Sequence, residues 1–339
     1  MSAESGSAEA TTPERPDPYL PSLSRLSHHE KRGKRAVMKK LTRDNVFYAF
    51  SGDLEPALEI EPGEMVRMET HDCFGGQLQT EADTVDTLDW ERVNPATGPV
   101  YIRGALPGDI LAVDIEDVQV ADQGAMVSIP GEGALGDIIT ETEIRIFRME
   151  RGQALFNDKV RLPVKPMIGV VGVAPKGKPV PNTTPDAHGG NMDCTLIGAG
   201  CTVHLPVNTE GALLGMGDMH SVMGDGEILV CGLEVQGEVV FSTRVLREAK
   251  LPTPFLDTAD LVATVYSART ADEAADGAIH AMAQFLTEIV DMGVNEAGMI
   301  MSIAGELKFC QVVDPLKTVR FEFPKSVLSA YGFSMGELR

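Results

Sequence analysis

The sequence predicts a β-rich α+β fold, with many short strands in sandwich- or barrel-like sheets and a pair of helices late in the chain. Three observations support this fold class. Short apolar runs alternate with turn residues from about residue 45, and the chain contains 34 glycines and 21 prolines. The segment 109–117 has the two-residue period of a strand. Clear helical periodicity begins only at residue 270.

The first predicted element is a disordered tail over residues 1–40. Its first half is acidic and its second half is basic. Residues 1–20 carry four acids and one base, whereas residues 21–40 carry seven bases and one acid. The basic run has two interpretations: a nucleic-acid arm, or a segment that lies on its own acidic body or on a neighbouring subunit. Residues 41–339 are predicted to form one large β-rich body, as a single domain or two subdomains.

The next elements are strands separated by turns. Leu111, Val113 and Ile115 alternate with more polar positions, which is the pattern of a strand with one buried face. The sequences EPGE at 61–64 and LPGD at 106–109 combine proline and glycine as turns do. This alternation of short apolar runs and turn residues continues to about residue 245 and predicts stacked or closed sheets.

The last elements are two helices. Thr270 followed by Glu273 predicts a capping box at the start of the first helix. Its apolar stripe consists of Ile279, Met282, Phe285, Leu286 and Ile289. Gly293 is predicted to end this helix, and a second helix is predicted to begin at Asn295.

The composition argues against several classes of protein. Hydrophobic residues make up 43% of the chain, but no apolar run reaches the roughly 18–20 residues of a membrane helix, so we expect a cytoplasmic protein without a membrane partner. Five cysteines without a CxxC pair disfavour a disulfide scaffold. A net charge of −21 disfavours nucleic acid as a partner. The GxSxG, P-loop and GxGxxG motifs are absent.

The stretch TTPDAHGGNMDC, residues 183–194, predicts half of a metal site. Imidazole nitrogen mixed with carboxylate oxygen is a ligand set of zinc and similar ions, so His188 and Asp193 are candidate ligands. Gly189 and Gly190 allow a positive φ or a close backbone approach, and with Asn191 they are candidate substrate-binding residues. The alternative is a structural turn rich in Asp and Asn.

The stretch GMGDMHSVMGDGEI, residues 215–228, repeats this set of side chains. Asp218 and His220 are two residues apart, so in a strand both would reach one ion. Asp225 and Glu227 follow a turn and are the candidate catalytic carboxylates, with Glu227 as the base. One of these carboxylates can instead bind the metal or hold a histidine nitrogen. The alternative is a structural or calcium-type acidic turn, so calcium at a second site is a further hypothesis.

A third segment, METHDCFGGQ at residues 68–77, offers one more carboxylate. Asp72 is the candidate metal ligand here, because His71 would point to the opposite side of an extended strand. Cys194 is a weaker candidate nucleophile than water activated by a metal, since nothing in the sequence indicates a low thiol pKa.

Together these motifs resemble the acetamidase/formamidase family of amide hydrolases, over about residues 45–325. The matching segments are ETHDCFGGQ, NPATGPVYIRGALPGDILAVDI, PMIGVVGVAP, HGGNMD, LPVNTEGALLGMGDMHSVMGDGE and FCQVVDP. The resemblance implies a β-rich α+β fold, a divalent metal (usually zinc), hydrolysis of short amides to a carboxylate and ammonia, and a homo-oligomer. Met223 stands where the family often has a glutamine, and this difference would make the pocket more apolar.

Two other functions fit the same residues. One is hydrolysis of cyclic amides, lactams or imides, at the same metal. The other is a non-catalytic β protein that binds a cation or a carbohydrate through its acidic loops. The first would open rings without ammonia release, at least for a lactam, and the second would bind metal without turnover.

Overall fold

The computed structural model describes residues 38–338. The predicted tail therefore lies outside the described residues as far as residue 37. Its last two positions, Lys39 and Lys40, belong to strand β1, which pairs in parallel with β5. The chain divides into a unit of residues 1–35 and a unit of residues 36–339, and the description below concerns the second.

The strands of the first half are β1 (Lys39–Leu41), β2 (Val46–Phe47), β3 (Ala49–Phe50), β4 (Leu58–Ile60), β5 (Val66–Thr70), β6 (Ala96–Ile102), β7 (Ile110–Ser128), β8 (Glu143–Glu150), β9 (Gln153–Leu155) and β10 (Arg161–Pro163). Those of the second half are β11 (Met167–Gly172), β12 (Val180–Pro181), β13 (Gly189–Asn191), β14 (Thr202–Pro206), β15 (Leu214–Val222), β16 (Leu233–Leu246), β17 (Phe255–Asp257), β18 (Leu261–Ala268), β19 (Glu306–Gln311) and β20 (Lys317–Pro324). The helices are α1 (Ala271–Glu288), α2 (Val294–Ala304) and α3 (Lys325–Ala330).

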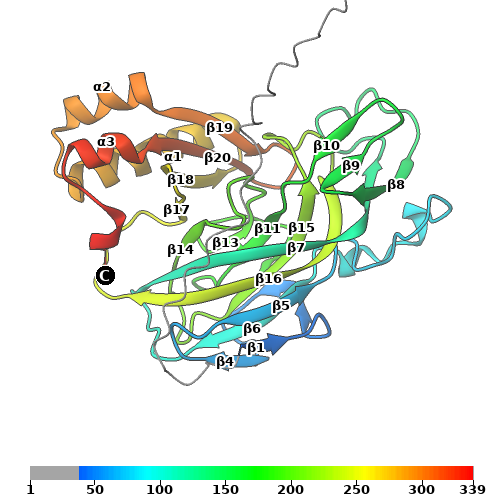
Figure 1. The fold of residues 1–339 in the computed structure, drawn as a ribbon, viewed down its shortest axis with the longest axis horizontal. Coiled ribbons are helices and arrows are strands. Elements are labelled where there is room, and N and C mark those ends of the chain that lie inside the picture. Colours follow the sequence, from blue (N-terminus) through cyan, green and yellow to red (C-terminus); the bar gives the residue numbers. More distant parts are fainter. Residues whose placement is uncertain (1–37, 339) are drawn as a thin grey trace, which may run out of the picture. The chain divides into compact units, whose positions relative to one another are not determined.

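Two long antiparallel strands, β7 and β16, run through the body (Figure 1). The sequence predicted a strand at 109–117, and β7 continues this strand to Ser128. Strand β7 pairs further with β14 and β8, and β16 pairs with β5 and β15. Within residues 38–338 these sheets do not close into a barrel, and the β-rich α+β class is confirmed.

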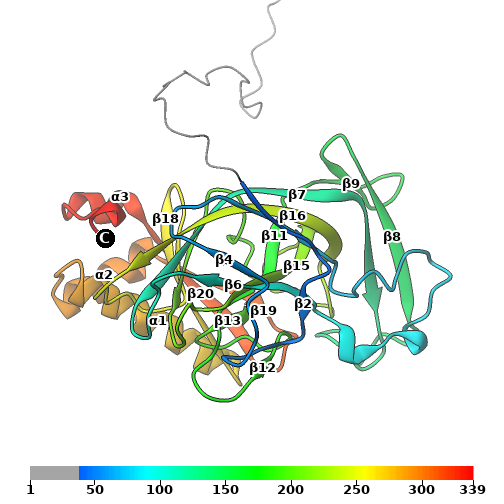
Figure 2. The same cartoon turned by 90° about the horizontal axis from the view of Figure 1, so that it is seen from below.

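The main core consists of side chains from several strands, among them β6, β7, β11, β15 and β16, whose arrangement Figure 2 shows. Leu111, Val113 and Ile115 point into it, as their alternation predicts, together with Met219 and Phe241. Strand β11 lies at the centre because it pairs with both β13 and β15. The two loops that carry the candidate site residues are thereby attached to neighbouring strands.

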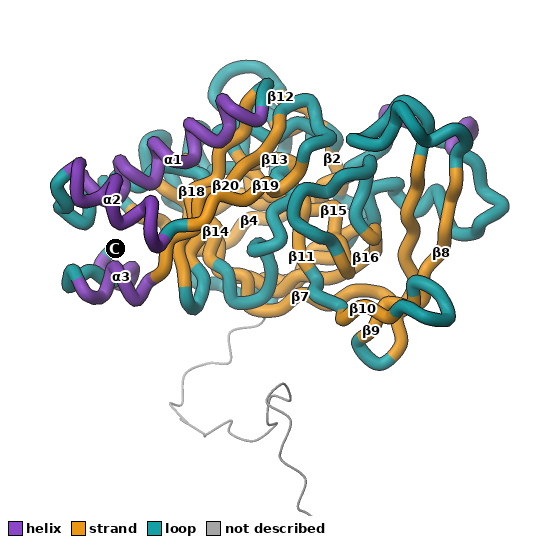
Figure 3. Tube along the Cα trace, turned by 90° about the horizontal axis from the view of Figure 1, so that it is seen from above, coloured by secondary structure: helices purple, strands orange, loops and turns teal. Residues whose placement is uncertain are grey.

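The C-terminal part adds a layer of strands β17, β18, β20 and β19, with α1 packed against β18 and β20 (Figure 3). The capping box of Thr270 and Glu273 is present. The prediction for Gly293 was wrong: α1 ends at Glu288, and Gly293 is the N-cap of α2. Its φ of −62° is one that any residue adopts, so it has no C-capping function.

Residues 38–338 contain no helix of the length and apolarity that crossing a membrane requires.

Candidate active site

Four buried carboxylates surround one buried histidine. His220 on β15 lies opposite Glu234 on β16, and Nε2 of His220 is 2.9 Å from Oε1 of Glu234. The same nitrogen is 3.4 Å from Oδ1 of Asp218 and 3.8 Å from Oδ1 of Asp193. Donor atoms of Asp193, His220 and Glu227 lie within 4.8 Å of one another. The two glycine-rich stretches of the sequence therefore meet at one centre.

A second set of donor atoms adjoins the first. Cys73, Asp218 and Glu234 also offer one atom each within 4.8 Å of one another. His220 lies near both sets, because its ring contacts two carboxylates of the second set. The centre thus offers two neighbouring groups of three potential ligands.

The backbone is left-handed at three of these residues. The φ angles are 46° at Asp193, 56° at Asp218 and 32° at Glu227. Such conformations cost of order 1–3 kcal/mol each in residues other than glycine, and they concentrate at functional sites. The surrounding structure therefore holds these carboxylates in orientations that an unconstrained chain would avoid.

Two glycines leave room for the site side chains. A Cβ at Gly169 on β11 would lie 2.4 Å from Oδ1 of Asp193 and 2.7 Å from Oδ2 of Asp218. A Cβ at Gly232 would lie 2.6 Å from Nδ1 of His220. Any larger residue at either position would displace a member of the centre.

Burial and mutual repulsion raise the pKa values of the acids. Burial, followed by the charge of Asp218, raises the pKa of Asp193 to about 7. Burial raises the pKa of Glu234 to about 8 and that of Glu227 well above its usual range. Burial alone would lower the pKa of His220, but the charges of Glu234 and Asp218 outweigh it and raise this pKa. The centre therefore favours protons or cations.

Most of the carboxylate oxygens lack aligned hydrogen-bond donors. Within residues 38–338 these are both oxygens of Asp193, both of Glu234, Oδ1 of Asp218 and Oε2 of Glu227. A buried anion without donors is costly unless a cation or a proton compensates it. These oxygens and the imidazole fit a divalent cation, because they form the mixed oxygen and nitrogen set that such ions bind.

A cavity of about 410 Å³ opens onto the centre. Three of the carboxylates line it, namely Asp218, Glu227 and Glu234, whereas Asp193 and His220 lie behind them. Apolar residues also line it, namely Phe74, Trp90, Val127, Val230, Val313 and Pro315. A ligand in the cavity would therefore meet both carboxylates and hydrocarbon.

Asn191 lines this cavity, as its predicted substrate-binding role requires. Its Nδ2 donates a hydrogen bond of 2.9 Å to Oδ2 of Asp314. Gly189 and Gly190 have φ of 93° and 87°, in agreement with the sequence prediction of positive φ. A Cβ at Gly189 would lie 2.2 Å from the Val171 carbonyl oxygen. The N–H of Gly189 already donates to the Asp186 carbonyl, so it is not free for a substrate.

Two predicted metal ligands lie outside both donor sets. Burial lowers the pKa of His188 to about 4, and its ring packs edge-on against Phe50 at 5.2 Å between centroids. It precedes β13 and packs beneath Gly190 instead of reaching His220. Asp72 accepts a hydrogen bond of 3.0 Å from the N–H of Gly76. Its carboxylate faces a separate small cavity of about 130 Å³, which Glu234 also lines.

Asp225, a predicted catalytic carboxylate, is also outside the centre. Both of its oxygens accept hydrogen bonds from the guanidinium of Arg320. Thr195 donates a further bond to it. This pairing lowers the pKa of Asp225 against the effect of its burial.

The sequence analysis missed Cys73, Glu234 and Asp314. Glu234 shares the two-residue period of Gln236 and Glu238, which indicates a solvent-facing side of a strand. It is nevertheless buried, opposite His220 on the neighbouring strand β15. Asp314 precedes a proline, which is typical of a surface turn. The signal in its favour was its place in the FCQVVDP segment.

The site combines one histidine, several buried carboxylates and an adjoining cavity in a β-rich fold. This combination is typical of hydrolases that use a metal ion, and it defines the class of candidate site. The sequence itself then gives the family. The chain belongs to the Acetamidase/Formamidase family, whose sequence model matches residues 35–184 and 177–268.

Similar proteins agree with this family. The crystal structure of an acetamidase from Bacillus halodurans superposes with a TM-score of 0.86 at 42% identity, covering 87% of this chain and 100% of that one. The formamidase of Methylophilus methylotrophus is 25% identical, with 58% of this chain and 63% of the relative covered. The acetamidase of Mycolicibacterium smegmatis is 26% identical, with 53% and 60% covered. The chain thus spans about three fifths of the length of these two relatives.

Proposed function

We propose that this protein hydrolyses short-chain linear amides such as formamide and acetamide to a carboxylate and ammonia, with the help of a divalent cation. The observation that carries the proposal is the buried centre of Asp193, His220 and Glu227 beside the cavity. The family and the relatives named formamidase and acetamidase support it.

The first group of donors suits zinc, our first candidate metal, since it combines an imidazole with carboxylates. Asp193 and His220 would hold it from behind the cavity wall. The second group contains two carboxylates, Asp218 and Glu234, and so suits a hard cation such as calcium, which prefers oxygen ligands. When bound, a divalent cation polarises the amide carbonyl and lowers the pKa of water at the site.

Glu227 is the residue best placed to carry the proton. It lines the cavity, its Oε2 has no hydrogen-bond donor among the described residues, and its pKa is raised. As a carboxylate it would accept a proton from the attacking water. As an acid it would then return that proton to the amide nitrogen, which leaves readily only when protonated.

Asn191 and Asp314 would orient the amide. Both line the cavity and are joined by a hydrogen bond, and Oδ1 of Asn191 has no donor within residues 38–338. An amide NH₂ group donates two hydrogen bonds, so Oδ1 of Asn191 and a carboxylate oxygen of Asp314 match it.

The size of the cavity favours larger or cyclic amides as a second class of substrate. Acetamide has four heavy atoms and fills on the order of 100 Å³, if each takes about the volume of a water molecule. The cavity holds about 410 Å³ and has an apolar wall. A longer acyl chain or a lactam ring would occupy this remaining space.

A group of exposed apolar side chains on the body supports a homo-oligomer, which we propose as the working assembly. Leu135, Ile138, Phe156 and Leu162 are 38–67% exposed in the region of residues 135–162. Association of two copies would bury such residues. Light scattering of the purified chain measures this directly, and a monomer at micromolar concentration would contradict it.

The function is tested with the purified full chain and a panel of formamide, acetamide, longer amides and lactams. We expect at least one bound divalent ion per chain, ammonia release from the linear amides, and loss of turnover after chelation that zinc restores. Full turnover by a metal-free preparation would refute the role of the cation. No product from any linear or cyclic amide would refute the proposed function itself.

A further inference from the structure

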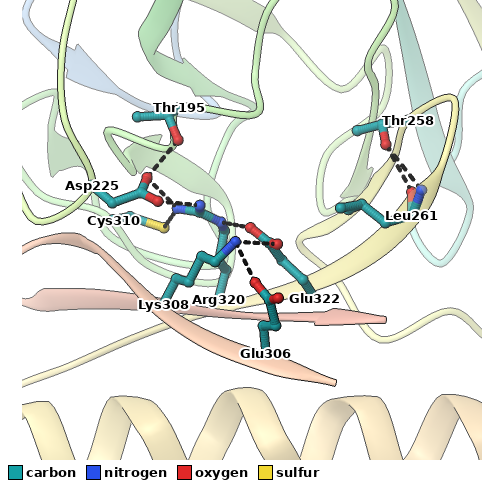
Figure 4. A network of polar contacts seen from close by, with 9 residues as sticks. All are labelled: Thr195, Asp225, Thr258, Leu261, Glu306, Lys308, Cys310, Arg320 and Glu322. Atoms are coloured by element: carbon teal, nitrogen blue, oxygen red, sulfur yellow. Dashed lines mark hydrogen bonds and ion pairs between the residues drawn. The ribbon is translucent and has the colours of Figure 1, made fainter. Parts of the chain in front are cut away.

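The guanidinium of Arg320 on β20 is buried, with the residue only 1% exposed. Its Nη1 and Nη2 donate to the two oxygens of Asp225 at 2.9 and 2.7 Å, and its Nε donates to Glu322 at 2.7 Å (Figure 4). Lys308 donates to the other oxygen of Glu322 at 2.8 Å. Burial of an arginine is costly unless its charge and its N–H groups are paired. A bidentate hydrogen bond also fixes the orientation of the guanidinium relative to the carboxylate.

Asp225 connects the two loops of the candidate site. Besides Arg320, it accepts a hydrogen bond of 2.5 Å from the hydroxyl of Thr195 (Figure 4). Thr195 lies two residues after Asp193, and Asp225 lies two residues before Glu227. One carboxylate thus fixes the chain on both sides of the centre.

Strand β19 holds the same region through its backbone. The N–H of Gly226 donates to the Cys310 carbonyl at 3.0 Å. The side-chain oxygen of Gln311 accepts from the N–H groups of Val313 and Asp314 at 2.9 and 3.0 Å. The loops of Glu227 and Asp314 are therefore both attached to the β19–β20 layer.

We propose that Thr195, Asp225 and Arg320 form a positioning device for the amide-hydrolysing centre, and that Asp225 acts through it and not at the reacting atoms. This inference rests on the proposed function for its kinetic consequence. Its physical basis is that Asp193 and Glu227 both have left-handed φ, a conformation that persists only where the surrounding structure holds it. The bonds of Asp225 to Thr195 and Arg320 supply such a constraint on both loops.

The chain contains a matched motif remote from the centre. Thr202 donates to Asp114 at 2.7 Å, and Nε and Nη2 of Arg244 donate to Asp114 at 2.8 Å each. The residues lie on β14, β7 and β16, and none lines the active-site cavity. Substitutions in this motif remove the same kinds of bond without touching the centre.

The test compares Asp225→Asn and Thr195→Val with Asp114→Asn and Thr202→Val, all in the full chain. The readouts are steady-state kinetics and hydrogen exchange of the peptide that covers residues 223–228. We expect Asp225→Asn to lower kcat by about 10- to 100-fold, since misplacement by 1 Å costs about that much, with a smaller change in KM. Thr195→Val should lower kcat less but in the same direction. Both variants should speed exchange in the peptide, and the two controls should change neither readout.

Three results would overturn the inference. The first is unchanged exchange and unchanged kcat in Thr195→Val. The second is a loss of kcat in Asp225→Asn without faster exchange, which would place Asp225 at the reacting atoms. The third is an equal loss in the Asp114→Asn control. If the wild-type chain hydrolyses no amide, the proposed function fails, but the exchange measurement still decides the positioning role.

Discussion

Replacing Gly169 with alanine is the smallest change that tests the geometry of the centre. The added Cβ would lie 2.4 Å from Oδ1 of Asp193, whereas ordinary contact begins at 3.4 Å. The carboxylate or the strand must therefore move by about 1.0 Å, the difference between these distances. The same Cβ would lie 2.7 Å from Oδ2 of Asp218, so it would be too close to both carboxylates. The φ of Gly169 is not in the left-handed region, so alanine adds no backbone strain.

This displacement has two measurable consequences. Overpacking of this kind costs about 1–3 kcal/mol. For a body of about 300 residues that cost lowers Tm by roughly 2–5 °C. A misplacement of 1 Å in a catalytic centre lowers kcat by about 100-fold. Because Asp193 is a candidate ligand, the bound metal should fall as well.

The assay combines ammonia release from acetamide, metal content and calorimetry, with Gly224→Ala as the matched control. Gly224 precedes the Glu227 loop, and a Cβ there would meet no atom within 4 Å. The control should behave like the wild type. If Gly169→Ala matched this control in kcat, metal content and Tm, the described arrangement of the two carboxylates would be wrong.

Glu227→Gln should keep the metal and lower kcat by about 10²–10⁴ in the ammonia assay, whereas metal loss would make Glu227 a ligand. His220→Ala should lose both metal and turnover, while His280→Ala on the exposed side of α1 should lose neither; equal behaviour of the two would exclude His220 from the centre. Burial lowers the folded-state pKa of His204 to about 4 from a usual value near 6.5, so below pH 6.5 the unfolded chain binds a proton that the folded chain does not. Urea unfolding at pH 7 and pH 5 should therefore show about 2 kcal/mol less loss of stability in His204→Gln than in the wild type, and identical losses would contradict this.

The residue types in the two glycine-rich stretches predicted the core of the candidate site. Asp193, Asp218, His220 and Glu227 do converge, because the two stretches adjoin strands that pair with β11. Strand periodicity was sufficient to put Asp218 and His220 near one another. The alternation of short apolar runs with turn residues predicted the β-rich α+β class, and the family resemblance implied the same fold.

Other features of the site and the fold depend on contacts between residues far apart in the sequence, which strand periodicity does not predict. Glu234 followed the polar positions of its strand, but the opposing β15 strand buries it. Asp225 is two residues from Glu227 in sequence, yet its partner Arg320 is 95 residues away. Gly293 was predicted to end α1, although that helix ends at Glu288 and Gly293 is the N-cap of α2. For Glu234 and Asp225, contacts with residues on other strands determine the surroundings that the local pattern did not predict.

The long interval between Asp225 and Arg320 has a consequence for biosynthesis. The chain emerges from the ribosome N-terminus first, so the loops of Asp193 and Glu227 are made well before β20. Until β20 docks, Asp225 has no guanidinium to pair with, and the loops lack their link to the C-terminal layer. The centre is thus completed among the last steps of folding. An interrupted chain that ends before residue 317 would contain every candidate metal ligand but would lack Arg320, and with it the proposed positioning device.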